Sequence, residues 1–272
     1  MKIYPKVSEY LEGMNVLKEY IQNNKGMEIQ MLSWDEIDKI YGIIQKIKQE
    51  IPDIEEITIH PPLKEWFNFE VLTFDNSENN RINWIIKASN DFNIKINLLY
   101  HTRWNFECWK KSGVLENLKE IIDELQDTNV NIVLENMFSM VDKENCTVLQ
   151  IAKEINNSHL GVCLDTCHLH CQANIFKKDF NEFLDNYLNI DDCNKYVYQI
   201  HFAGTLENDG FINMKTHGRK HNSLEDCKTD FDDILIKYNI QDKIIVTEIS
   251  EENYDLRKDQ FDEIKMLEQI DF

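Results

Sequence analysis

The sequence predicts an α/β protein, a single (β/α)8 barrel over residues 1–272, because short β-branched runs alternate eight times with longer amphipathic stretches. Eight strand–helix units need roughly 250 residues, close to the 272 residues of this chain. Runs such as "NIVL" (131–134) and "KIIV" (243–246) are typical of parallel strands buried on both faces. The alternative is an open doubly wound sheet, which is weakened because no Gly-rich phosphate fingerprint follows the first run.

The individual elements follow from the same alternation. The expected strands occupy, in chain order, residues 2–7, 27–32, 56–60, 95–101, 130–135, 160–165, 196–202 and 243–249. The expected helices follow them at 13–23, 35–50, 80–92, 113–126, 146–156, 176–189, 223–238 and 255–269. In the stretch 35–50, for example, Asp35 can cap the start, and Ile37, Ile40 and Ile44 recur at helical spacing. The connections 61–79 and 204–222 are longer than simple strand–helix loops, and such long loops are often functional.

The composition limits the partners that the chain can have. It carries 49 acidic and 29 basic residues, a net charge of −20, and 42% of its residues are hydrophobic. This hydrophobic content supports a core rather than disorder, while the acidic surplus disfavours a nucleic-acid partner and favours metal cations. Seven cysteines without the spacing of a disulfide scaffold indicate reduced thiols in a cytoplasmic protein. We expect no membrane partner, because no signal peptide or apolar stretch of membrane-spanning length is evident.

Six consecutive expected strands end on a histidine or an acidic residue, at the end where barrel enzymes carry their catalytic groups. Only 57 of the 272 residues are of these types, 49 acidic residues and 8 histidines, so composition alone does not explain the run. Imidazole nitrogens and carboxylate oxygens are suitable ligands for Zn, Mn or Fe. We therefore expect a divalent metal site at the barrel mouth, formed by His60, His101, Glu135, Asp165, His201 and Glu248.

Side-chain alternation along the strands adds a second prediction, because every second residue points into the barrel. The expected inward-facing sets are Glu135 with Val133 and Asn131, Asp165 with Cys163 and Gly161, Glu248 with Val246 and Ile244, and His201 with Gln199 and Val197.

The stretch "GVCLDTCHLH" (161–170) combines an apolar run with one acid, two histidines and nearby thiols, which suggests a metal site, a redox site or a buried strand. Within the series of strand ends, Asp165 is the ligand that the strand delivers, and His168 is a further ligand or substrate contact. We expect Cys163, Cys167 and Cys171 to be packing residues, because no Cys-x-x-Cys pair is present.

The ordered segments "ITIHPP" (57–62), "LEN" (134–136), "GVCLDTCH" (161–168) and "VTEIS" (246–250) resemble the xylose isomerase-like TIM barrels. This superfamily includes sugar (phosphate) isomerases and epimerases and the endonuclease IV-type enzymes, also called AP endonuclease family 2. The resemblance covers most of the chain, and "GVCLDTCH" is its most specific segment.

The isomerase and epimerase branch implies one divalent ion held by Glu135, Asp165, His201 and Glu248. The two glutamates would transfer a proton at a carbon beside a carbonyl, through an enediolate, and His168 would contact substrate oxygens. The resemblance implies phosphate contacts from Arg103, Lys215, Arg219 or Lys220, and Trp104 is a candidate for stacking on a sugar or a base.

The endonuclease IV branch implies up to three zinc ions, with Glu135 bridging two of them and activated water attacking a phosphodiester of abasic DNA. Its ligands would be His60, His101, Glu135, Asp165, His168, His201, His221 and Glu248.

Two departures disfavour the endonuclease branch. An Asp-x-His pair is expected in the loop after strand 196–202, where "KTHGRKHNSL" (215–224) offers Arg219 and His221, with His217 as a substitute. The Gly-rich stretch that should follow is replaced by "LEDCKTDFDD" (224–233). The sequence alone thus favours an isomerase or epimerase acting on a small carbohydrate, with an endonuclease IV-like zinc phosphodiesterase as the alternative. A barrel that only binds a ligand is disfavoured because Glu135 and Glu248 are both present.

Overall fold

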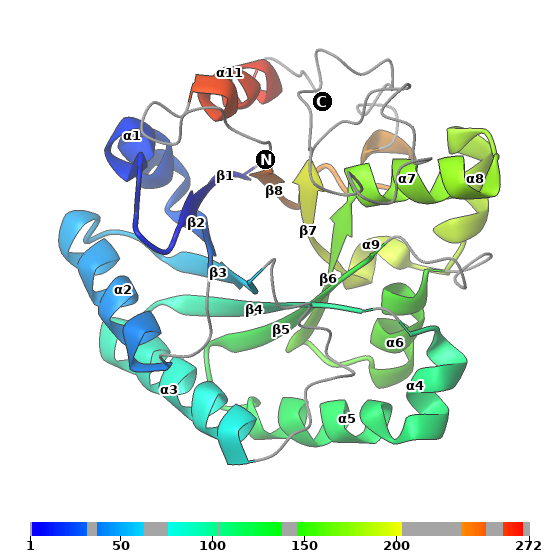
Figure 1. Cartoon of the computed structure of the whole chain (residues 1–272), viewed down its shortest axis with the longest axis horizontal. Helices are drawn as coiled ribbons and strands as arrows, with labels where there is room; N and C mark the ends of the chain where they lie inside the picture. Colours follow the sequence, from blue (N-terminus) through cyan, green and yellow to red (C-terminus); the bar gives the residue numbers. More distant parts are fainter. Residues whose placement is uncertain are drawn as a thin grey trace.

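The computed structural model describes residues 2–31, 37–62, 76–102, 104–137, 146–202, 235–248 and 258–268. Eight parallel strands close into a barrel in chain order, with β1 (Lys2–Ser8) hydrogen-bonded to β8 (Ile244–Thr247). The helices form a ring around the strands (Figure 1), and the (β/α)8 barrel predicted from the sequence is confirmed. The other strands are β2 (Gly26–Gln30), β3 (Glu56–His60), β4 (Lys95–His101), β5 (Val130–Glu135), β6 (Leu160–Asp165) and β7 (Val197–Phe202).

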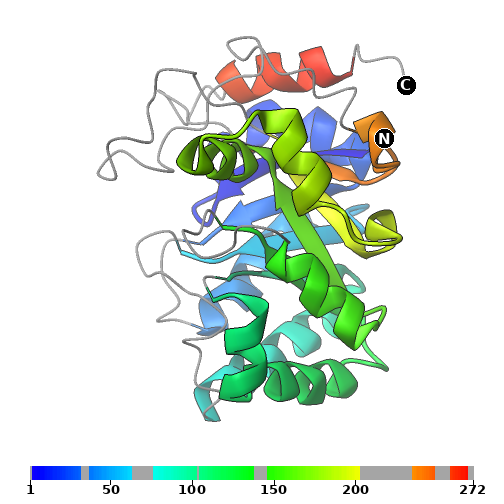
Figure 2. The same cartoon turned by 90° about the vertical axis from the view of Figure 1, so that its right-hand side faces the viewer.

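The described helices cover the outside of the barrel. They are α1 (Met14–Asn24), α2 (Ile37–Glu50), α3 (Asn76–Phe92), α4 (Phe106–Ser112), α5 (Val114–Glu124), α6 (Thr147–Ile155), α7 (Thr166–Phe176), α8 (Phe180–Tyr187), α9 (Cys193–Tyr196) and α11 (Lys258–Leu267). Both views place α11 beside α1 (Figures 1 and 2), where Phe261 packs edge-on against Tyr20. The last helix therefore closes the ring next to the first one.

The sequence prediction missed α7, which begins directly after β6. A helix was expected only at 176–189, where α8 lies. The reason is burial: most residues of α7, including its polar Thr166, His168 and Gln172, lie inside the protein, so the helix has no polar stripe to reveal its period. The expected helix at 223–238 lies mostly outside the described residues.

The main apolar core lies between the strands and the helices, and contains the outward-facing Ile132 and Leu134 of β5. Inside the barrel, smaller apolar groups contain Val133, Cys163, Ile244 and Val246, as side-chain alternation predicts.

One inward-facing prediction is wrong, because Val197 packs in the outer core. The pairing of β6 with β7 shifts between Val162 and Cys163, and this bulge turns Tyr198 into the barrel beside Gln199. Gly161 provides the space, since a Cβ atom there would lie 2.6 Å from the Cβ of Tyr198.

No helix among the described residues is long and apolar enough to cross a membrane. The six cysteines that the structure describes form no disulfide, and Cys163, Cys167 and Cys171 are buried.

Candidate metal centre

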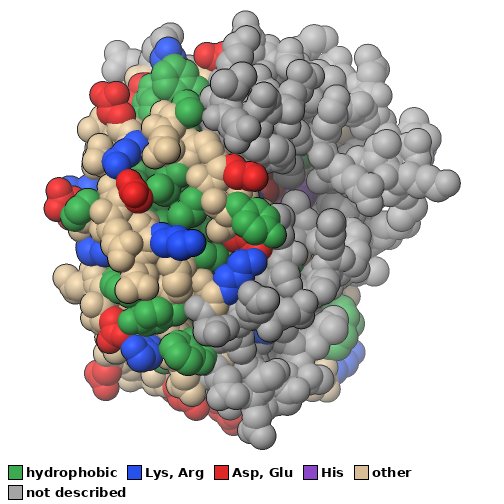
Figure 3. Space-filling model, turned by 60° about the vertical axis from the view of Figure 1, so that its left-hand side comes forward, with side chains coloured by type: hydrophobic (Ala, Val, Ile, Leu, Met, Phe, Trp, Pro, Cys, Tyr) green, Lys and Arg blue, Asp and Glu red, His purple; other side chains and the backbone are tan. Residues whose placement is uncertain are grey.

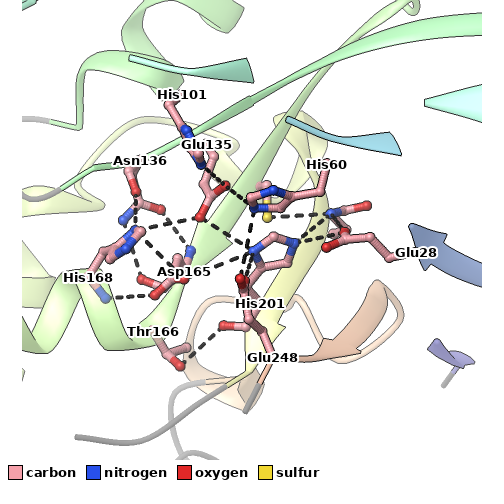
Figure 4. A network of polar contacts seen from close by, with 12 residues as sticks. Glu28, His60, His101, Glu135, Asn136, Asp165, Thr166, His168, His201 and Glu248 are labelled. Carbon is pink, nitrogen blue, oxygen red and sulfur yellow. Dashed lines mark hydrogen bonds and ion pairs between the residues drawn. The ribbon is translucent and has the colours of Figure 1, made fainter. Parts of the chain in front are cut away.

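The described strand ends bring together the histidines and acids that the sequence singled out (Figure 4). These side chains come from β3 to β7 and from the residue that follows β8. All are buried except Glu248, whose side chain is 11% exposed. The residues that converge are His60, His101, Glu135, Asp165, His201 and Glu248.

Glu135 lies at the centre of this cluster, and its two oxygens face different neighbours. Its Oε1 atom lies 3.3 Å from Nδ1 of His201, while its Oε2 atom lies 3.1 Å from Nε2 of His101 and 3.5 Å from Nε2 of His60. Two donor sets therefore share this carboxylate, and within each set the ligand atoms lie within 4.8 Å of one another. One set is Glu135, Asp165, His201 and Glu248, and the other is His60, His101 and Glu135.

The spacing of these donor atoms fits a divalent cation. Ligand atoms about 2.0–2.2 Å from a tetrahedral ion lie roughly 3.4 Å from one another. The contacts of Glu135 with the three imidazoles, at 3.1–3.5 Å, fall close to that separation. Nitrogen and oxygen donors in this combination suit zinc, manganese or iron.

Two buried atoms of the cluster that lack hydrogen bonds also favour a bound cation. Among the described residues, neither Oε2 of Glu135 nor Nδ1 of His201 has a hydrogen-bond partner of acceptable geometry, although both atoms are buried. Nδ1 of His201 lies 2.5 Å from Oε2 of Glu248, so these two atoms would have to move apart to bind the same ion. Buried polar atoms without hydrogen bonds are costly. A cation in the set with His60 and His101 would satisfy Oε2 of Glu135, and one in the set with Asp165 and Glu248 would satisfy Nδ1 of His201.

Backbone carbonyls set the tautomers of two of the histidines. Nδ1 of His60 lies 2.9 Å from the carbonyl of Pro61, and Nδ1 of His168 lies 2.9 Å from the carbonyl of Asn136. A ring N–H that donates to a carbonyl leaves the opposite Nε2 atom with a lone pair. For His60 this lone pair points toward Glu135.

Asp165 is the last residue of β6 and the N-cap of α7, and its carboxylate also faces the candidate metal centre. Its Oδ1 atom accepts a hydrogen bond from the backbone N–H of His168 at 2.6 Å, and its Oδ2 atom lies 3.9 Å from Nδ1 of His201. The cap places His168 against the cluster, with its Nδ1 atom 3.5 Å from Oε1 of Glu135.

The pKa shifts reflect a dense group of opposite charges. Burial alone would raise the pKa of Glu135, but the adjacent His201 and His101 hold it well below its ordinary value. Burial alone would lower the pKa of His201, yet Cys163 and the surrounding carboxylates raise it well above its ordinary value. The pKa of His60 is lowered by burial and by Lys6. Several buried carboxylates thus compete for few positive charges, which favours a bound cation.

Sequence reasoning missed Glu28 and Lys6, which lie within strands rather than at their ends. Glu28 Oε2 lies 2.9 Å from Nε2 of His201, and Nζ of Lys6 lies 3.0 Å from Glu28 Oε1 and 2.5 Å from Glu248 Oε1. The available signal was a charged residue at an inward-facing position of each of two otherwise buried strands, in "YPKVS" (4–8) and "GMEIQ" (26–30).

The predicted substrate-contacting residues are placed only in part. Trp104 follows β4 and is 39% exposed, while Arg103, Lys215, His217, Arg219, Lys220 and His221 lie outside the described residues.

His170 stacks on Phe180, with ring centroids 3.6 Å apart, and burial lowers its pKa to about 4. In the space-filling view, a histidine surface is visible in a hollow of the molecule (Figure 3).

Comparison with protein families shows a match over residues 25–270 to the family described as xylose isomerase-like TIM barrel. Among curated proteins, the probable endonuclease 4 of Shouchella clausii is 36% identical over 78 residues. That match covers 27% of this chain and 26% of the relative, so it spans about a quarter of either protein.

Solved structures with the same fold carry diverse names. The TTHB071 protein of Thermus thermophilus, soaked with zinc chloride, aligns with a TM-score of 0.65 at 15% identity and covers 100% of both chains. The probable 3-DHS dehydratase AsbF of Bacillus anthracis aligns with a TM-score of 0.64 at 11% identity, covering 98% of this chain and 100% of that one. The 3-keto-D-glucoside 4-epimerase YcjR of E. coli aligns with a TM-score of 0.55 at 14% identity, covering 99% of this chain and 100% of that one.

Proposed function

We propose that this chain, which belongs to the family of xylose isomerase-like TIM barrels, is a metal-dependent phosphodiesterase with a dinuclear centre bridged by Glu135. The observation that carries this proposal is the division of the Glu135 carboxylate between two donor sets, with His201 facing Oε1 and His60 and His101 facing Oε2. An isomerase that uses one ion has no need of the second set.

Two divalent ions held about 3.5–4 Å apart stabilise both the attacking and the leaving oxygen in phosphodiester cleavage. The residues of this chain would supply that arrangement. One ion would be held by Asp165, His201 and Glu248, and the other by His60 and His101. Glu135 would be a ligand of both ions. His168 lies 3.6 Å from Oδ2 of Asp165, near enough to contact a substrate oxygen or a further ion at the mouth.

The match to a probable endonuclease 4 supports a phosphodiester of nucleic acid, with abasic DNA as the substrate to test. The net charge of −20 opposes extended contact with a duplex. The described surface in Figure 3 also disfavours extended contact with a duplex, because basic and acidic side chains are interspersed on it. The basic residues Lys215, Arg219 and Lys220 would then provide local phosphate contacts.

A second candidate function is the isomerisation or epimerisation of a small carbohydrate. The observation that favours it is that Glu135, Asp165, His201 and Glu248 form a complete donor set without His60 and His101. Glu135 and Glu248 would then exchange a substrate proton. A structural neighbour named as a 4-epimerase supports the idea that the fold accommodates this chemistry.

Metal content and cleavage activity separate the two candidates. We expect at least two divalent ions per chain by elemental analysis, and cleavage of an abasic-site oligonucleotide at low salt. His101→Ala should reduce cleavage strongly, though less than loss of the shared Glu135, because it removes a ligand of the second set only. His159→Ala is the matched control, since His159 is half-buried and its ring contacts the carbonyl of Val130 at the start of β5. One bound ion, with no cleavage by the wild type, would favour the isomerase.

A further inference from the structure

Glu28 and Lys6 form a buried ion pair beside the candidate metal centre, on the neighbouring strands β2 and β1. Figure 4 shows Glu28 next to His201, on the side of the ring that faces away from Asp165. Nε2 of His201 lies 2.9 Å from Oε2 of Glu28, while Nδ1 of the same ring faces Glu248 and Glu135. The imidazole of His201 therefore connects Glu28 to the donor set.

We propose that Glu28 is a positioning residue, which fixes the ring of His201 so that its Nδ1 lone pair points at the metal site. Lys6 holds Glu28 in place and, through Oε1 of Glu248, also orients a proposed ligand. The inference rests on the metal centre proposed above, and it is independent of which reaction that centre catalyses.

The contacts of Glu28 distinguish it from a metal ligand, although its carboxylate lies within 4.8 Å of donor atoms of His60, His201 and Glu248. Its Oε2 atom accepts hydrogen bonds from Nε2 of His201 and, at 3.0 Å, from Nε2 of Gln199. Its Oε1 atom is paired with the ammonium of Lys6. A metal ion at Glu28 would have to displace these hydrogen-bond donors, whereas the imidazoles around Glu135 can offer it an unprotonated nitrogen.

The neighbouring side chains make this arrangement rigid. Gln199, which donates to Glu28, accepts a hydrogen bond from the hydroxyl of Thr58 at 3.0 Å. Thr58, Gln199 and Glu28 are all fully buried. A carboxylate that accepts from the outer N–H of a metal-binding imidazole sets its tautomer and its orientation, and losing such a partner typically lowers metal affinity about 10–100-fold.

The test measures zinc affinity of the purified full chain by competition with a chelator, and the number of ions bound by elemental analysis. We expect Glu28→Ala to weaken zinc binding about 10–100-fold while the number of ions stays the same. Glu28→Gln should recover part of that loss, because an amide oxygen can still accept from Nε2 of His201. Glu56→Ala is the matched control, since Glu56 is another buried carboxylate inside the barrel, and its zinc affinity should equal that of the wild type.

Two results for the variants would overturn the inference. Wild-type affinity in Glu28→Ala would show that Glu28 does not position His201, and the loss of one ion would show that Glu28 is itself a ligand. A wild-type chain without bound zinc would overturn both this inference and the metal centre. Normal zinc binding without phosphodiester cleavage would overturn only the proposed reaction.

Discussion

Two buried carboxylates at opposite ends of the barrel interior differ in how their oxygens are satisfied. Glu56, at the start of β3, accepts hydrogen bonds from Tyr4 at 2.9 Å, from Asn97 at 3.0 Å and from Tyr198. Glu135, at the end of β5, faces imidazole nitrogens instead, and its Oε2 atom has no hydrogen bond among the described residues. Hydrogen-bond donors of the fold satisfy the first carboxylate, and the second lies in the proposed metal site.

The pKa values alone do not reveal this difference, because both are lowered. Burial opposes the shift in each case, while Asn97 and Tyr198 lower the pKa of Glu56 and histidines lower that of Glu135. The chemistry of the partners separates the two sites, since amide and hydroxyl groups donate permanently whereas imidazoles can instead offer lone pairs to a metal.

The largest effect is expected at the shared carboxylate. Glu135→Ala removes an oxygen from both donor sets, so both ions should be lost or bound far more weakly. Losing metal stabilisation of a transition state costs several kcal/mol, here about 4 kcal/mol, or on the order of 10³-fold in kcat/KM. Elemental analysis and steady-state cleavage of an abasic-site oligonucleotide measure the two effects. Retention of full metal content would show that Glu135 is not a shared ligand.

Metal removal should give the next largest effect, on stability. A ligand at 100 times its dissociation constant stabilises a fold by about 2.7 kcal/mol, which corresponds to roughly 5–10 °C in Tm for a chain of this size. Chelation should therefore lower the Tm of the wild type by that amount, and added zinc should restore it. Glu135→Ala should show no such zinc-dependent shift, whereas Glu56→Ala should retain it in full. An equal shift in both variants would contradict the difference between the two carboxylates.

The barrel and most of the histidines and acids of the candidate metal centre could be predicted from the sequence, because both follow from where each strand begins and ends. The eight strands repeat one apolar pattern, and a candidate ligand at the end of a strand is found by locating where that pattern stops, as for His60, Glu135 and Asp165. Each strand observed lies within two residues of its expected ends.

What the sequence could not predict depends on contacts between distant segments. Glu28 meets His201 across 173 positions, and Lys6 meets Glu248 across 242. Neither pair has a local pattern, because a charged residue within a strand is indistinguishable from one that faces solvent until the closed barrel gives it a direction. The bulge at Tyr198 and the buried helix α7 were missed for a related reason, since packing overrides the period in both.

A smaller effect is expected at the satisfied carboxylate. Glu56→Ala leaves the polar groups of Tyr4, Asn97 and Tyr198 without their acceptor inside the barrel, which should cost about 1–3 kcal/mol of unfolding free energy. Urea denaturation measures this loss, and metal content should stay at the wild-type level. A variant as stable as the wild type would mean that the three donors find other acceptors.

The smallest expected effect is the pH dependence of the unfolding free energy that Glu56→Ala loses. The folded pKa of Glu56 is lowered from its ordinary value of 4.5, so the ionised carboxylate stabilises the fold above pH 4.5, and this contribution disappears as the pH falls through the folded pKa. The stability gap between the wild type and Glu56→Ala should therefore be widest near pH 7 and should narrow below pH 4.5. Denaturation midpoints of both proteins over this range measure the gap, and groups that titrate alike in the two proteins cancel in the difference. A stability gap that stays constant down to about pH 3 would show that Glu56 acts through neutral hydrogen bonds. Glu56 would then differ from Glu135 in its charge as well as in its hydrogen-bond partners.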